Sequence, residues 1–388
     1  MKKIKQIIKT KIIELYDKRV RNQMKKGEVQ SYKDSQKRGV YSIANINNEQ
    51  IKETENLYKE NYGEEIDLTW HKHYTSFTNK FDKYYFPEIL FIPEFEYIMN
   101  SNKEYCKVME DKNILPIFAE YAKIKMPKTI VSCQEGLYKN ANNEIIGKEE
   151  VVKILENYGY CFAKPSIDSC SGQGCMLLNI HDNIDQNSKK STQQVIDELG
   201  ENFIIQEQIK CHESIRKIYE GSVNTFRIMT YRWKDKIKAA PAIMRIGRNG
   251  SVVDNAHAGG IFIAINNDGT LHKTAFTQFN DQYTVHPNSK TVFEGYKIEG
   301  FSNTIDAVKK LHAIVPNIGV INWDMTIDED GNPVLIEANI NGGGIWVFQE
   351  AHGKGPFGED TEEILQWLKF MKNVKYADRK KYLFGKKR

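Results

Sequence analysis

One short segment near the C-terminal end constrains the fold more than any other. A strand pattern over residues 322–328 is followed by an Asp-Gly-type turn and a second strand pattern that leads into a glycine loop. Folding this hairpin brings Asp324, Glu337 and Asn339 together at one end of a sheet. Oxygen ligands on neighbouring strands suit Mg²⁺, which prefers a few carboxylates together with substrate phosphates. The segment therefore predicts metal–nucleotide chemistry, with an ordinary hairpin that has acidic ends as the alternative.

A second segment places a lysine next to glycines. Residues 160–165 predict a buried strand with Lys164 near its end, and a loop of small residues with Gly172 and Gly174 follows. Such a lysine can meet a phosphate from one side while backbone N–H groups meet it from another. The loop lacks the GxxxxGK[ST] order of a P-loop. A phosphate-binding loop and a plain hairpin turn are the two interpretations.

The next strand pattern, over residues 203–209, is apolar up to Glu207. A strand that runs into an open cleft can offer its backbone N–H and C=O groups to the edge of an adenine ring. An acid near its end can accept the ribose hydroxyls, and Glu213 is a candidate for that contact.

Residues 222–231 alternate polar and apolar side chains as a strand does. Asn224 and Arg227 cannot share one face of a regular strand, so we expect Asn224 in the turn before it. Arg227 lies between two apolar residues, where a charge needs a partner. A transferring phosphate is a fitting one.

The order of these motifs resembles the ATP-grasp superfamily, and more narrowly its sugar-transfer-associated branch, found with bacterial surface-polysaccharide genes. The narrower likeness rests on residues 222–227, 253–260 and 286–287, and the whole resemblance covers about residues 105–350. It implies an α/β (α+β) fold in which two α+β subdomains clamp ATP. The expected domains are a mainly helical accessory lobe (1–105), a small subdomain with the glycine loop (106–215), and a large subdomain with the Mg-ATP site and a C-terminal helix (216–388).

The resemblance also implies roles for individual residues. Asp324, Glu337 and Asn339 would hold Mg²⁺. Lys164 would contact the α- and β-phosphates of ATP, and Arg227 would face the γ-phosphate or the acyl phosphate, both as part of the catalytic machinery. The residues expected to line the nucleotide and acceptor sites are Lys128, Lys164, Ser171, Gly172, Gly174, Glu207, Ile209, Glu213 and Asn341. His257 lies in a glycine-flanked loop and would accept a proton from an incoming amine. A histidine that only hydrogen-bonds its own loop is the alternative.

The chemistry that the resemblance implies is ATP-driven ligation of small molecules. A carboxylate attacks the γ-phosphorus of ATP, and an amine or another nucleophile then displaces phosphate from the acyl phosphate. Phosphoryl transfer of this kind depends on alignment and charge neutralisation more than on covalent help from the protein. The substrates would be a carboxylate and an amine or sugar of surface-polysaccharide biosynthesis. A phosphotransferase and a nucleotide-binding scaffold without turnover are the two alternatives.

Composition and charge exclude other classes of protein. With 55 basic and 51 acidic residues the net charge is only +4, too balanced to indicate a nucleic-acid partner. The six cysteines show no zinc-type spacing, which favours reduced thiols in a cytoplasmic protein. No apolar run reaches the roughly 18 residues that a membrane helix needs.

The chain ends and connecting segments carry a few further signals. In the first 19 residues, isoleucines and Leu15 recur at helical spacing, with most lysines off that stripe. This helix either packs on the body with solvated lysines or docks, on a partner or on an anionic membrane surface at the inner membrane face. The C-terminal tail is basic too. We also expect helices over 49–62, 148–158 and 361–370, and a buried, proline-bracketed connector over 86–93.

Overall fold

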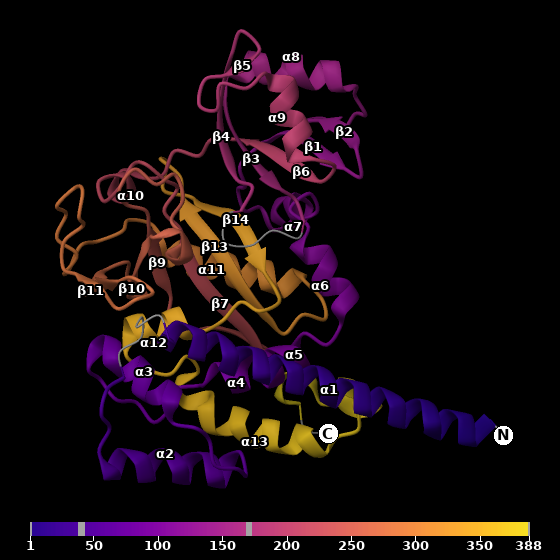
Figure 1. Ribbon diagram of the computed structural model, residues 1–388, viewed down its shortest axis with the longest axis vertical. Coiled ribbons are helices and arrows are strands. Elements are labelled where there is room, and N and C mark those ends of the chain that lie inside the picture. Colours follow the sequence, from indigo (N-terminus) through magenta and orange to yellow (C-terminus); the bar gives the residue numbers. More distant parts are fainter. Residues whose placement is uncertain (1, 38–42, 168–172, 387–388) are drawn as a thin grey trace.

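The computed structural model describes residues 2–37, 43–167 and 173–386. Two antiparallel sheets dominate it, a six-stranded one and an eight-stranded one. Figure 1 shows the smaller sheet above the larger one, with helices from both chain ends gathered beneath the larger sheet. The long N-terminal helix α1 (Lys2–Lys37) crosses this lower side and extends past the rest of the chain.

The small sheet has the strand order β2-β1-β6-β3-β4-β5. Its strands are β1 (Thr129–Gln134), β2 (Leu137–Asn140), β3 (Tyr160–Pro165), β4 (Met176–His181), β5 (Ile184–Asp185) and β6 (Phe203–Glu207). Helices α8 (Lys148–Tyr158) and α9 (Thr192–Leu199) pack on it. Their apolar residues form a separate hydrophobic core with the strands, so this unit is stabilised largely by its own packing.

The large sheet has the order β12-β11-β10-β9-β7-β13-β14, with β8 paired to β7. Its strands are β7 (Phe226–Trp233), β8 (Lys236–Ala239), β9 (Ile243–Ile246), β10 (Ile261–Ile265), β11 (Leu271–Phe276), β12 (Gln282–Tyr283), β13 (Val320–Ile327) and β14 (Pro333–Asn339). The central strand β13 is buried along its whole length. Its side chains alternate between the two faces of the sheet, as the pleat requires.

Each face of the large sheet is covered by its own hydrophobic core. On one face, Trp323 and Met325 pack with α7 (Leu115–Ala122) and α11 (Phe301–Ile314), near α6 (Lys103–Glu110). The other face is covered by elements from both chain ends. They are α2 (Asn48–Asn61), α3 (Thr69–Thr78), α4 (Glu88–Leu90), the π-helix η1 (Phe91–Glu96), α5 (Tyr97–Met99), α12 (Trp346–His352), α13 (Thr361–Asn373) and η5 (Leu383–Gly385). The short helix η3 (Gly358–Asp360) precedes α13, and η4 (Tyr376–Lys381) follows it and contacts α1.

Most of the predicted elements are present. The helix expected over 148–158 is α8, those over 49–62 and 361–370 are α2 and α13, and the lysine-bearing strand is β3. Asn224 lies before β7, where its amide donates to the carbonyl of Tyr219 and its oxygen accepts from the backbone N–H of Gly247. The connector expected over 86–93 is buried, but it is helical (α4 and η1). Pro93 falls in the first turn of η1, where the missing N–H of a proline is tolerated.

Helix α1 divides into two halves. Its C-terminal half packs on the body: Lys25 pairs with Glu94, and the ring of Tyr32 lies 5.5 Å from that of Trp70. In its N-terminal half Ile12 and Leu15 are exposed, so the first of the two interpretations, in which the stripe packs on the body, is wrong for these residues. None of the helices in the described ranges is both long enough and apolar enough to cross a bilayer.

The boundaries of the expected domains stay a proposal. Residues before and after position 105 share the core under the large sheet, and that core also includes the C-terminal helix α13. Phe95 lies at its centre, with ring centroids 4.9 Å from Phe357 and 6.1 Å from Trp367. The N-terminal and C-terminal segments therefore stabilise each other through shared burial.

We predict that Phe95→Ala lowers the free energy of unfolding by about 3–5 kcal/mol, because a fully buried ring is lost and a cavity remains. Chemical denaturation of the whole chain measures this. Tyr121→Ala removes a ring that is 78% exposed and serves as the control with little expected change. A loss for Phe95→Ala as small as that of the control would contradict the shared core.

Candidate functional site

The acid of the predicted metal hairpin lies on β13, between two partner strands. Asp324 is directly opposite Glu337 on β14 and Arg227 on β7. Between Asp324 and Met325 the register shifts, so that β14 has one extra residue, Ile336, at this point. Such a bulge leaves a residue outside the regular ladder, with its carbonyl free for another donor.

Lys164 of the small sheet reaches this bulge. Its Nζ donates to the carbonyl oxygen of Ile336 at 3.4 Å, although 172 residues separate the two along the chain. The lysine is buried, and burial lowers its pKa, an effect that the nearby Glu337 carboxylate opposes. The predicted phosphate lysine and the predicted metal acid therefore lie at one junction between the two sheets.

A second lysine at this junction was not expected from the sequence. Lys112, in the turn between α6 and α7, forms an ion pair with Glu337 at 3.0 Å. Its backbone N–H donates to the carbonyl of Ser166, just after β3. Lys112 thereby joins the small sheet to the rim of the large one. No motif surrounds it, and only its position in space reveals it.

Asp324 is held by two arginines. Arg227 makes a bidentate pair with it at 2.9 and 2.8 Å, and Arg245 on β9 approaches the same carboxylate at 3.1 Å. Burial alone would raise the pKa of Asp324, but these two guanidinium groups bring it down to about 2. The partner that the sequence required for Arg227 is thus a carboxylate within the fold.

Arg245 extends the cluster toward a further acid. It lies 3.5 Å from Asp254 and donates to the hydroxyl of Thr225 at 3.0 and 2.7 Å. Thr225 in turn donates its backbone N–H and its hydroxyl to Asp254. Arg245 has apolar neighbours on a short strand and shows no motif, so sequence reasoning missed it. Its position between two apolar residues in the sequence was the available signal, since a charge in such a place needs partners.

The oxygen donors beside this cluster fit a Mg²⁺ ion. Asp324 and Glu337 supply carboxylates, and Asn339 donates its amide N–H to Asp324 at 3.3 Å, which leaves the amide oxygen for another contact. Asn322, two residues before Asp324 on the same strand face, is fully buried, and neither its side-chain oxygen nor its side-chain nitrogen has a partner among the described residues. Such an unpaired amide indicates a place for a further ligand or water.

The residues predicted around the base lie on or just after strands of the small sheet, whereas the predicted ribose residue Glu213 lies beyond that sheet. Lys128 and Glu207 form an exposed ion pair at 3.3 Å where β1 and β6 meet. Ile209 is partly exposed just after β6. Glu213 begins α10 (Glu213–Arg216), which packs its Ile215 into the core of the large sheet, and pairs with Lys217 at 2.8 Å. These positions leave the ribose assignment of Glu213 as a proposal.

Part of the predicted glycine loop lies outside the described residues, including Ser171 and Gly172. Gly174 is described and has a positive φ of 73°. A Cβ there would approach Cγ of Pro165 to 2.8 Å. The turn therefore requires a glycine at this position for its own geometry, whatever ligand the loop meets.

The predicted acceptor residues surround the second glycine loop, which links β14 to α12. Asn341 accepts from Lys103 and donates to Glu110. Glu96 on η1 accepts the backbone N–H groups of Gly342 and Gly343 at 2.8 and 3.2 Å, and its burial raises its pKa to about 7. Helix η1 thus fixes the shape of this loop.

His257, in η2 (Ala256–Ala258), lies on the same side of the site. Its ring centroid is 5.8 Å from that of Trp346, the first residue of α12, and its Nδ1 is 2.7 Å from the amide oxygen of Gln278. The side chain is exposed, so it is open to a substrate. Its role as a base stays a proposal.

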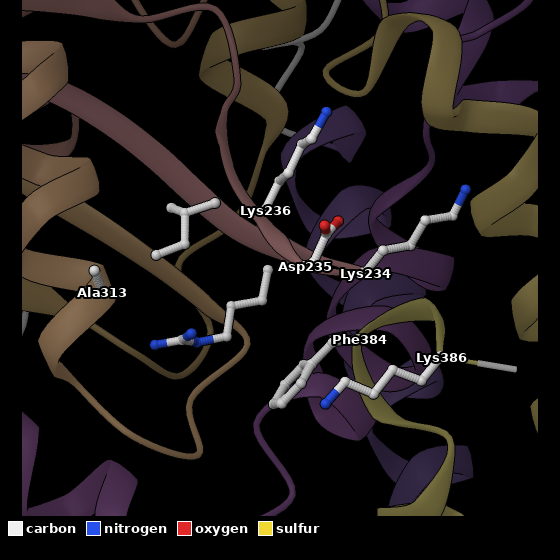
Figure 2. Close-up of a pocket in the computed structure, with 8 residues that line it drawn as sticks. Lys234, Asp235, Lys236, Ala313, Phe384 and Lys386 are labelled. Atoms are coloured by element: carbon white, nitrogen blue, oxygen red, sulfur yellow. The ribbon is translucent and has the colours of Figure 1, made fainter. Parts of the chain in front are cut away.

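A hollow of about 690 Å³ lies elsewhere, around the turn between β7 and β8. Figure 2 shows Phe384 beside Lys386, with Lys234, Asp235 and Lys236 of the turn pointing away from the ring. Arg232 donates to the carbonyls of His312, Val315 and Ile318, and Lys234 pairs with Glu363 at 2.8 Å. Two of the charged residues that line the hollow, Arg232 and Lys234, therefore connect β7 and the turn after it to neighbouring segments. The hollow shares no residue with the Asp324 cluster.

The family comparison agrees with this geometry. A family described as sugar-transfer associated ATP-grasp matches residues 92–364. The chain belongs to this family. The expected α/β (α+β) fold of ATP-grasp type is thereby confirmed for a chain with two sheets and an acidic hairpin at their junction. A comparison with curated proteins gave no match.

Several solved structures of ligases and synthases resemble this ATP-grasp chain at low identity. An N5-carboxyaminoimidazole synthase from Aspergillus clavatus, complexed with ADP and 5-aminoimidazole ribonucleotide, is 11% identical (TM-score 0.37, 61% of this chain, 46% of that one). An L-amino acid ligase from Bacillus licheniformis is 12% identical (TM-score 0.35, 64% and 47%). The VanG D-Ala:D-Ser ligase from Enterococcus faecalis is 12% identical (TM-score 0.38, 67% and 61%). The chain thus spans about half to three-fifths of the length of these structures.

The Asp324 cluster predicts a distinct pH dependence of stability. Because the pKa of Asp324 is about 2 in the folded chain, its stabilising effect is complete above pH 4 and is lost as the pH falls through 2. In Asp324→Asn this pH-dependent part of the free energy of unfolding, on the order of 2 kcal/mol, should be missing. At neutral pH the variant should be about 3–5 kcal/mol less stable, because two buried arginines lose their counter-charge.

Denaturant titrations between pH 7 and pH 2 measure both effects. Asp306→Asn is the matched control, because Asp306 is exposed on α11 and should leave the profile unchanged. An Asp324→Asn profile parallel to that of the unchanged chain would show that the ion pairs do not form in solution.

Proposed function

We propose that this chain is an ATP-dependent ligase that activates a carboxylate as an acyl phosphate and joins it to an amine or another nucleophile. The single observation that supports this most is the contact of Lys164 with the bulge beside Glu337. It brings a cation of the small sheet next to the acids of the large sheet at one junction. Such a junction suits a triphosphate held between two lobes.

The charges at the junction are compatible with a phosphate chain. Lys112, Lys164, Arg227 and Arg245 supply four positive charges, against the three carboxylates of Asp254, Asp324 and Glu337. Arg227 and Lys164 would bind and orient the phosphoryl group by charge-assisted hydrogen bonds. Their present carboxylate partners keep the cations in place without a ligand. Mg²⁺, when bound at Asp324, Glu337 and Asn339, would neutralise phosphate charge.

Residues of the small sheet, together with Glu213 of α10, would position the rest of the nucleotide. Backbone groups around Glu207 and Ile209 would bind the base, Lys128 would meet the phosphate side, and Glu213 would take the ribose. The loop with Ser171, Gly172 and Gly174 would cover the phosphates and exclude water, which protects an acyl phosphate from hydrolysis.

The acceptor side would lie at the loop that begins with Asn341. The exposed imidazole of His257 next to Trp346 supports its role as the base that takes a proton from the incoming amine. We place the reaction in surface-polysaccharide or related sugar and amino-acid conjugate biosynthesis. The family description, which names sugar transfer, supports this place.

Product analysis tests the reaction type. Release of ADP and phosphate that requires both a carboxylate and a nucleophile, in a screen of amino acids and sugar acids, is the expected result. A stable phosphorylated product formed without a nucleophile would indicate a phosphotransferase instead. Nucleotide binding without any turnover would indicate a scaffold.

In the same ADP-release assay, Glu337→Gln should lower kcat by about 100-fold or more, because a charge that serves the metal and phosphates is lost. Glutamine keeps the size of the side chain, so the fold should persist. Glu329→Gln, in the exposed hairpin turn, is the control. Equal rates for the Glu337 variant and the control would remove the metal assignment.

Lys164→Ala should weaken ATP binding about tenfold or more, since a charge-assisted hydrogen bond to phosphate is lost. Calorimetric titration with a non-hydrolysable ATP analogue measures the affinity. Lys153→Ala removes an exposed lysine on α8 of the same subdomain and should have no effect. An unchanged affinity in the Lys164 variant argues against its contact with phosphate.

A further inference from the structure

The N-terminal half of α1 presents an apolar face that no other part of the described chain covers. Ile8, Ile12, Leu15 and Tyr16 are 53%, 60%, 69% and 68% exposed. Their spacing puts them on one side of the helix, since residues three and four apart are neighbours there. Figure 1 shows this half of α1 extending beyond the other helices. Isolated exposed apolar residues are ordinary, but a row of four along one helix indicates a binding surface.

In this segment most of the described basic side chains are exposed, whereas one of its two acids is buried. Residues 2–21 contain eight lysines and arginines and only two acids. The side chains of Lys9, Lys11, Lys18 and Arg19 are exposed. Asp17, in contrast, is buried, where it pairs with Arg379 at 2.9 Å and with Arg21 at 3.2 Å. The exposed side of the segment is therefore apolar and basic, with this carboxylate turned toward the body.

The body holds α1 in this orientation. Arg379 belongs to η4, which packs against α1 and also carries the exposed Lys380. Farther along, Lys25 pairs with Glu94 of η1. The basic C-terminal segment thus adjoins the basic N-terminal helix, and both contribute positive charge to one region of the surface.

From this arrangement we infer that the exposed half of α1 is a docking surface for an anionic lipid bilayer. A helix with apolar residues and lysines on its outer side can insert the former at the acyl boundary and place the latter among anionic headgroups. Each basic residue near such a surface adds attraction. A second copy of the chain is disfavoured as the occupant, because two strongly basic helices would repel each other.

This inference does not depend on the proposed ligase activity, because the apolar face of α1 and the Asp324 cluster share no residue. Vesicle flotation with the full chain tests it, using phosphatidylcholine vesicles with and without phosphatidylglycerol. We expect binding to the anionic vesicles, weaker binding to the neutral ones, and release as salt screens the charges. The double variant Ile12→Glu with Leu15→Glu should bind at least about tenfold more weakly.

Two exposed apolar residues on α7 provide the matched control. Ile117→Glu with Tyr121→Glu makes the same change in charge at side chains that are 62% and 78% exposed, and it should leave vesicle binding unchanged. The α1 variant should keep the thermal stability of the unchanged chain. The inference is overturned if the unchanged chain does not float with anionic vesicles, or if both double variants bind equally. It is also overturned if light scattering shows a dimer that only the α1 variant loses.

Discussion

The buried pairing of Asp324 with Arg227 and Arg245 is the interaction on which the rest of the site depends. An ionised carboxylate within a sheet would be costly unless nearby cations compensate for the lost water. Here the compensation comes from the two neighbouring strands β7 and β9, and it holds the pKa of Asp324 at about 2. The pairing keeps a negative charge and two positive charges at fixed positions before any ligand binds, which is how preorganised sites stabilise charge.

The bulge on β14 connects this buried pairing to the other sheet. One extra residue lets Glu337 stand opposite Asp324 while the carbonyl of Ile336 accepts from Lys164. Lys112 adds a second link, with its side chain on Glu337 and its backbone on Ser166. The two sheets therefore meet through polar contacts around charged groups, whereas each sheet has its own apolar core. A polar junction can exchange its partners for a ligand at a lower cost than a packed apolar interface can.

Local pattern was sufficient to predict those parts of the fold in which one segment determines its own structure. The boundaries of α8 follow from helical spacing and a terminal glycine, and the strand with Lys164 follows from its apolar run. Asn224 was expected before its strand because polar and apolar faces alternate. The helix over residues 88–96 was missed, since two prolines and continuous apolar residues hide its periodicity. For the exposed half of α1 the sequence left two interpretations open, because an apolar stripe does not show what covers it.

The candidate site was predictable only where a family motif marked it. Lys164, Arg227, Asp324, Glu337 and Asn339 each lie in a recognisable segment, and they gather at one junction. Lys112 and Arg245 join them through pairings between residues far apart in the chain, which no single segment encodes.

The most direct measurement is a crystal structure of this chain with Mg²⁺ and a non-hydrolysable ATP analogue. We predict a phosphate chain between Lys164 and Glu337, with Arg227 beside the terminal phosphate. A nucleotide bound elsewhere, with Lys164 still on the carbonyl of Ile336, would contradict it.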